Sequence, residues 1–155
     1  MEQFTMNLIK SIQRPVIRLD SFHGIRAMLD TGAIYPVWVA PERSLVSLCH
    51  VTLERKGISF SGFGGSTQGN LYKLPIVQIG KLIFPNMRIL TGNTDVPCDM
   101  ILSATMFKNL IYEIDDKNHK LNVTVPDDES LVRNIVIRNS RGNDFVLCGS
   151  ETDAT

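Results

Sequence analysis

The chain lacks an excess of charge of either sign. Its 155 residues include 16 lysines and arginines and 16 aspartates and glutamates, so the formal net charge is zero. A balanced chain creates no long-range field that would concentrate nucleic acid or anionic membrane around it. We therefore expect neither nucleic acid nor a membrane among its partners.

Cysteine is also scarce, and the three cysteines do not have the spacing of a disulfide framework or a metal site. Cys49, Cys98 and Cys148 are odd in number and far apart, which favours free thiols. Cys49 and His50 are the only adjacent Cys/His pair, and neighbouring residues seldom ligate one metal. We therefore expect no metal.

Long hydrophobic runs are missing as well. The most apolar run, residues 33–41, is about half of the roughly 20 residues that a membrane-spanning helix needs. The first ten residues, MEQFTMNLIK, do not have the basic and then apolar pattern of a secretory signal. These absences predict a soluble, cytoplasmic protein, and the length fits one domain.

The sequence does contain many short segments rich in Ile, Val, Leu and Tyr, which Gly, Pro, Asn or Asp often punctuate. This pattern favours a mainly β fold, as a barrel or a sandwich. The strands that we expect cover residues 14–20, 25–30, 34–40, 71–77, 81–90, 111–114, 120–125 and 134–137.

Two stretches have a helical pattern. In the first, apolar residues follow Pro41 at helical spacing, and residues 55–57 would suit its C-terminal end. A shorter helix is expected from Ala104 to Leu110. The acidic turn at residues 126–129 then divides a core domain, residues 1–125, from a C-terminal segment, residues 126–155, with two extra strands and a flexible tail.

The segment with the clearest chemical meaning is Asp30-Thr31-Gly32-Ala33, which follows an apolar strand. The strand would hold Asp30 in a fixed position, and Gly32 would let the backbone turn tightly beside the carboxylate. Such a carboxylate can act as a general base for water if a partner acid completes the cycle. By itself, Asp-Thr-Gly is more typical of a turn at a strand end.

A glycine-rich segment, residues 59–69, comes about 30 positions later. Gly62, Gly64, Gly65 and Gly69 are interspersed with β-prone residues. The segment lacks the Lys-Ser/Thr of a phosphate-binding P-loop, and Thr67 occupies the third glycine position of a GxGxxG motif. It is either a mobile hairpin that closes over a ligand or a solvated turn.

A third element runs from the apolar residues Ile101-Leu102-Ser103 into a short helical stretch, and a closing hairpin follows at residues 110–123. In this order, the elements of residues 12–125 resemble the retropepsin-like aspartic proteases, the single-domain relatives of pepsin. Asp30 to Ala33 matches the catalytic motif of that family. Ser103 departs from the pattern, because the family usually has glycine there.

The resemblance implies a retropepsin-like acid-protease barrel with one or two short helices and one lobe per chain. It implies that Asp30 is catalytic and that Thr31, Gly32 and Ala33 form the active-site loop. Ile101, Leu102 and Ser103 would lie beneath the active site. The residues implied for the substrate-binding flap are Phe60, Gly62, Phe63, Gly64 and Gly65, and those for apolar pockets are Ile34, Phe60, Phe63 and Val96.

Aspartic proteolysis requires two carboxylates that share a proton, and the chain contains one Asp-Thr-Gly. The resemblance therefore implies a C2 homodimer that hydrolyses peptide or protein substrates and needs no cofactor. One alternative, motivated by Ser103 and the C-terminal segment, is a weakly active or inactive module of the same fold that binds a protein partner. Another is a β-barrel that binds a small molecule under the glycine-rich loop.

Overall fold

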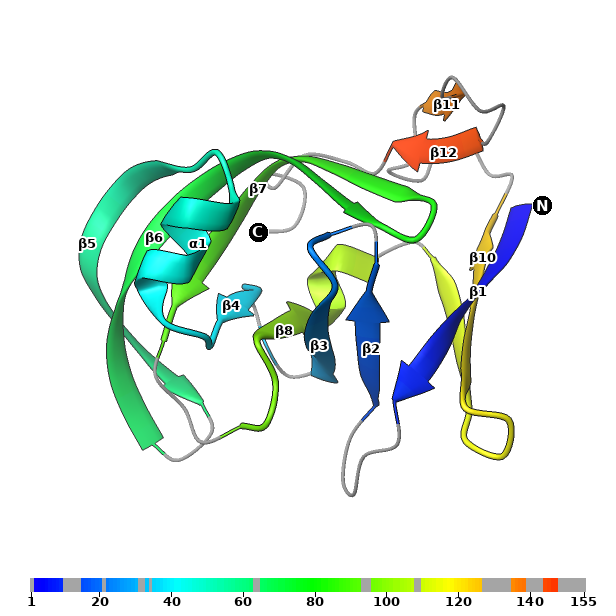
Figure 1. The fold of residues 1–155 in the computed structure, drawn as a ribbon, viewed down its shortest axis with the longest axis horizontal. Coiled ribbons are helices and arrows are strands. Elements are labelled where there is room, and N and C mark those ends of the chain that lie inside the picture. The colour runs from blue at the N-terminus through cyan, green and yellow to red at the C-terminus, as the bar shows by residue number, and fades with distance from the viewer. Residues whose placement is uncertain are drawn as a thin grey trace.

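The fold of the chain is mainly β, as Figure 1 shows. The computed structural model describes residues 2–9, 15–20, 22–30, 33, 35–62, 65–92, 96–107, 110–126, 135–138 and 144–147. The helices in these residues are α1 (Glu42–Leu48) and the 3-10 helix η1 (Ala104–Phe107). The strands are β1 (Glu2–Ile9), β2 (Val16–Leu19), β3 (Ile25–Asp30), β4 (Val37–Trp38), β5 (Thr52–Gly62), β6 (Gly65–Ile79), β7 (Leu82–Thr91), β8 (Met100–Ser103), β9 (Ile111–Asp115), β10 (Lys120–Val125), β11 (Ile135–Arg138) and β12 (Asp144–Leu147).

Strands β3 and β8 lie side by side in the middle of the sheet. They are parallel, and Asp30 is paired with Ser103 at their carboxyl ends. β2 is antiparallel to β3 on one side, and β4 is antiparallel to β8 on the other. The order continues through β1 and β10 to β9 at one edge, and through β7 and β12 to β11 at the other. Segments far apart in the sequence thus meet at the end of β3.

Strands β5 and β6 form a long hairpin, which curves along the left side of Figure 1. Residues 71–79 of β6 also pair with β7, whereas residues 65–69 pair with β5 alone. The part of the hairpin nearest its tip is therefore a two-stranded ribbon. The glycine-rich segment forms this ribbon, which agrees with the hairpin interpretation of its sequence.

The helix expected to end at residues 55–57 was predicted too long, because α1 ends at Leu48 and β5 begins at Thr52. Leu45 is the only residue of α1 that is buried, while Leu48 and Leu53 are 43% and 40% exposed. Leu53 pairs with Tyr72 of β6. The helical spacing of these leucines was coincidental, and the pairing with β6 decides the structure of residues 52–57.

Two other expectations also differ from the structure. Residues 2–9 were not expected to be a strand, but β1 pairs with β10 over six positions and with β2 at its end. The strand expected at residues 34–40 is limited to Val37 and Trp38 in the described part of that segment. The second helix begins at Ala104, as expected, and it is a 3-10 helix that ends at Phe107.

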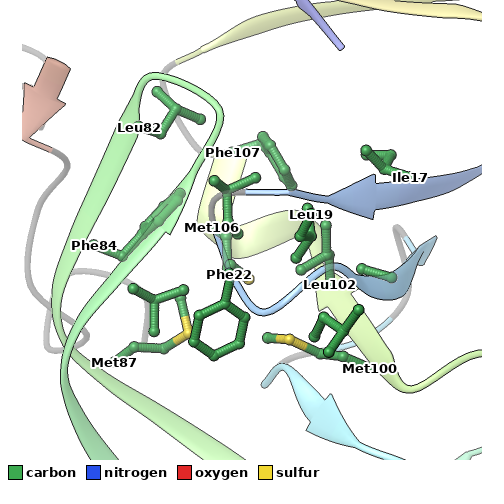
Figure 2. Packing of buried hydrophobic residues seen from close by; sticks show 14 of the residues in the cluster. Ile17, Leu19, Phe22, Leu82, Phe84, Met87, Met100, Leu102, Met106 and Phe107 are labelled. Carbon is green, nitrogen blue, oxygen red and sulfur yellow. The ribbon is translucent and has the colours of Figure 1, made fainter. Parts of the chain in front are cut away.

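The buried residues form two clusters, one on each face of the β3–β8 pair. Side chains alternate between the faces of a strand, so Leu29 and Leu102 belong to the larger cluster, and Met28 and Ile101 to the smaller one. Figure 2 shows Leu102 and Met100 of the larger cluster near Phe22, with Met106 and Phe107 of η1 above them. The carboxyl ends of β3 and β8 are therefore packed from both sides.

The C-terminal segment contributes two further strands to the sheet. β11 and β12 form an antiparallel pair, and β12 lies parallel to β7 at Leu82 and Ile83. The division between a domain of residues 1–125 and an extension of residues 126–155 stays a prediction. In the part of the chain that the structure describes, no helix has the length and apolar character to cross a membrane.

Candidate active site

Asp30 is the last residue of β3 and is half-buried, whereas the preceding residues Met28 and Leu29 are buried. The apolar strand is held on both faces, so it fixes the position from which the Asp30 side chain projects. The backbone N–H of Ala33 donates to the Asp30 carbonyl oxygen over 3.3 Å. This bond closes a turn immediately after Asp30. Thr31 and Gly32 lie outside the described residues.

Ser103 lies directly beside this turn. It is fully buried, and its hydroxyl Oγ donates a hydrogen bond to the Ala33 carbonyl oxygen over 2.7 Å. This bond gives the Ser103 hydroxyl a partner. A buried hydroxyl without one would be costly. Ile101 and Leu102, the other residues expected beneath the site, are also buried.

The hairpin contributes Phe60 to the same region. Phe60 packs against the smaller cluster, as do Ala33 after Asp30 and Val96. The Phe60 ring is so close to Gly92 that a Cβ at residue 92 would lie 2.7 Å from its Cζ atom. Phe60, Val96 and Ala33 thus pack against one cluster, and their assignment to one site stays a prediction.

The tip of the hairpin was also assigned to this site. Gly62 and Gly65 are the last paired residues of β5 and β6. Phe63 and Gly64 lie outside the described residues, and so does Ile34, which was assigned to an apolar pocket.

The two thiols that the structure describes are shielded from solvent to different degrees. Cys49 is half-buried and Cys98 is buried, and burial is the main cause that raises the pKa of both thiols above the usual value. A raised pKa keeps a thiol protonated and unreactive at neutral pH. Cys148 lies outside the described residues. Among the residues that the structure describes, no group of three or more His, Cys, Asp and Glu side chains is placed to hold a metal ion.

The sequence did not indicate a polar cluster beside the root of the hairpin, which is the point at residues 70–71 where β6 begins to pair with β7. The carboxylate of Glu42 accepts hydrogen bonds from Asn70 and Thr91, which are 28 and 49 positions away in the sequence. All three residues line a cavity of about 640 Å³ that also borders Gln68 and Gly57. No local pattern could have indicated this cluster, because its members come from α1, β6 and β7.

The fold, but not the sequence, is similar to known proteins. Neither a family model nor a curated protein matches the sequence. Among solved structures, the chain is similar to a retropepsin-like aspartic protease from Rickettsia conorii, with a TM-score of 0.53 and 18% identity. The match covers 80% of this chain and 91% of that protein. The expected mainly β, retropepsin-like fold is thereby confirmed, and at this identity the similarity shows the fold alone.

Proposed function

We propose that this chain is an aspartic endopeptidase that acts as a C2 homodimer, with one Asp30 from each copy. The observation that supports this proposal most directly is the position of Asp30. It lies at the carboxyl end of a buried strand, beside Ser103, in a retropepsin-like fold. Since the sequence has one Asp-Thr-Gly, the second carboxylate has to come from a second copy.

The proposed chemistry follows from the proximity of two carboxyl groups. Like charges at short distance cannot both ionise, so one Asp30 is a carboxylate and the other a carboxylic acid. The carboxylate removes a proton from a water molecule held between the pair, while the acid donates its proton to the scissile carbonyl oxygen. The resulting tetrahedral diol collapses, the C–N bond breaks and the leaving amine takes up a proton.

The rest of the chain would position the substrate. The two hairpins close over an extended peptide and exclude water from the reacting groups. Backbone hydrogen bonds hold such a peptide as an additional strand, and Phe60 and Val96 provide apolar surface for its side chains. The Ser103 hydroxyl and the turn at Ala33 hold the loop that follows Asp30.

The test compares Asp30→Asn with the wild type in cleavage of a peptide library from mildly acidic to neutral pH. The amide has the shape of the carboxyl group but cannot exchange protons in the same way. We therefore expect the variant to remain dimeric in sedimentation and to lose cleavage. Asp20→Asn is the matched control, because Asp20 is exposed in a turn after β2, and it should retain full activity.

Two results would count against the proposal. Cleavage by Asp30→Asn at the wild-type rate would remove Asp30 from the chemistry. A wild-type protein that cleaves no peptide and binds no pepstatin-type inhibitor would instead favour the protein-binding module.

A further inference from the structure

The outer part of the β5–β6 hairpin depends on what holds its root. Residues 65–69 of β6 pair with β5 alone, and pairing with β7 starts at Leu71. A two-stranded hairpin is at best marginally stable in water. The orientation of the outer hairpin, residues 58–69, therefore depends on contacts outside the ladder, which are the packing of Phe60 against the smaller cluster and the contacts at the point where the hairpin leaves the sheet.

Asn70 occupies this point and uses its polar groups to join the surrounding elements. Its side-chain Nδ2 donates to the Glu42 carboxylate, at 2.9 Å to Oε1 and 3.2 Å to Oε2. Its Oδ1 accepts from the backbone N–H of Gly57 over 3.2 Å, and its own backbone N–H donates to Thr91 Oγ1 over 2.9 Å. Through its side chain and its backbone N–H, this one residue links α1, both strands of the hairpin and the end of β7.

Gly57 allows its amide to reach Asn70. It has a φ of +67° and lies between Arg55 and Ile58, where the register of the β5–β6 ladder shifts. The left-handed backbone conformation is readily available to glycine. Because of this irregularity in β5, the Gly57 amide does not bond within the β5–β6 ladder. It donates instead to the Asn70 side chain at the root of the hairpin.

The Glu42 carboxylate is the centre of the cluster. Besides Asn70, it accepts a hydrogen bond from Thr91 Oγ1 over 2.7 Å and one from the hydroxyl of the buried Tyr72. Hydrogen bonds to an ionised acceptor are roughly twice as strong as those between neutral groups. Among the described residues, no cation forms an ion pair with Glu42, so neutral donors stabilise its charge.

The backbone at the root is packed closely against β7 and also borders open space. A Cβ at Gly69 would lie 1.7 Å from the Thr91 carbonyl oxygen, so β6 passes directly against the end of β7. Glu42, Asn70 and Gly57 border the cavity of about 640 Å³, which Gly69 and Thr91 also line. The outer hairpin is thus held at its root and by Phe60, which packs against the smaller cluster, and it has open space beside its root.

We propose that Glu42 and Asn70 are positioning residues that clamp the root of the hairpin and thereby set how firmly it closes on a substrate. The effect on catalysis rests on the proposed function, but the effect on the hairpin does not. Breaking the clamp should loosen residues 58–69 and leave the Asp30 pair unchanged. Substrate binding should therefore weaken more than the chemical step.

The experiment compares Glu42→Gln with Glu54→Gln. Each removes one carboxylate of the same region, but Glu54 lies on β5 below the root and forms an exposed ion pair with Arg88 over 3.0 Å. Backbone amide hydrogen exchange is measured for the outer hairpin and for residues 71–79. Glu42→Gln should speed exchange in the outer hairpin about tenfold, since a charge-assisted bond contributes about 1.5 kcal/mol. Glu54→Gln should leave it unchanged.

Peptide cleavage provides the second readout. Glu42→Gln should raise KM several-fold, with kcat and its pH profile close to wild type. Tyr72→Phe removes a single donor to Glu42, so it should give a smaller change in the same direction. It also keeps the test available if Glu42→Gln does not fold.

The outcomes separate the two proposals. Unchanged exchange in the outer hairpin, or faster exchange throughout the protein to the same degree, would overturn the clamp whatever the activity. Faster exchange confined to the outer hairpin, in a protein that cleaves no peptide even as wild type, would support the clamp and contradict the protease. A fall in kcat with unchanged KM would overturn the proposed effect on substrate binding.

Discussion

The hydroxyl of Ser103 donates a hydrogen bond to the Ala33 carbonyl oxygen in the turn that follows Asp30. A glycine at position 103 would leave that oxygen without this donor. We predict that Ser103→Ala lowers the free energy of unfolding by about 1–3 kcal/mol, the usual cost of leaving a buried polar group unsatisfied. Urea unfolding with an unchanged m-value is the measurement. Stability equal to wild type would show that the Ala33 carbonyl finds another donor.

Tyr72 gives a prediction about alkaline pH. Burial above all, and then the charge and the hydrogen bond of Glu42, raise the pKa of Tyr72 above its usual value. The folded state therefore holds this proton more tightly, and the contribution is complete below the unfolded pKa of about 10. As pH rises above that value, the free energy of unfolding should fall less in Tyr72→Phe than in wild type. Identical pH dependence of the two proteins in urea unfolding would contradict this.

Single residues were predictable from the sequence only where their neighbours in the chain gave the context. Asp30 is followed by Thr-Gly-Ala, and Ser103 ends an apolar run, so the sequence alone indicates both positions. Glu42 and Asn70 have no such local context. Their contact spans 28 positions and arises only when α1 and β6 come together.

At the scale of elements, the boundary between α1 and β5 shows why the helix was predicted too long. Leu45, Leu48 and Leu53 have helical spacing, yet two of them are exposed and do not form a buried helical face. Pairing of β5 with β6 over residues 52–62 outweighs the local preference. The hairpin itself was predictable, because its glycines and β-prone residues lie in one continuous segment.

The contact between β6 and β7 leads to a prediction about Gly69. In Gly69→Ala, the new Cβ would overlap the Thr91 carbonyl oxygen, since the two positions are 1.7 Å apart and that oxygen belongs to the backbone. The strands must separate, so we expect a loss of at least about 2 kcal/mol of unfolding free energy. Gly24→Ala is the control. It has no atom within 4 Å of the new Cβ and carries only the strain of a φ of +62°, which costs about 1–2 kcal/mol. An equal loss in both variants would contradict the proposed close contact.

For the whole molecule, the order of the segments allowed the fold class to be predicted, although no single motif was decisive. The sequence did not reveal that β1 pairs with β10 or that β12 lies beside β7. Pairings between distant strands depend on the register of the complete sheet, which local hydrophobic patterns do not specify.

The proposed dimer leads to a prediction about mixed subunits. When equal amounts of wild type and Asp30→Asn are unfolded and refolded together, about one quarter of random pairs contain two Asp30 residues. The mixture should have about one quarter of the activity of the same total amount of refolded wild type, because only these pairs have both carboxyl groups. The measurement is the rate of peptide cleavage by the mixture. A rate of about one half of that of refolded wild type would indicate that each chain acts alone.

The parallel pairing of β3 with β8 has a consequence for the timing of synthesis. The Ser103 hydroxyl and its acceptor at Ala33 are 70 positions apart, and the two strands on either side of this bond cannot pair until β8 has left the ribosome. Contacts this distant in sequence form late and slowly. The loop after Asp30 therefore reaches its final shape only after most of the chain has been made. For the proposed protease, a half-translated chain would therefore be unable to cut itself or its neighbours.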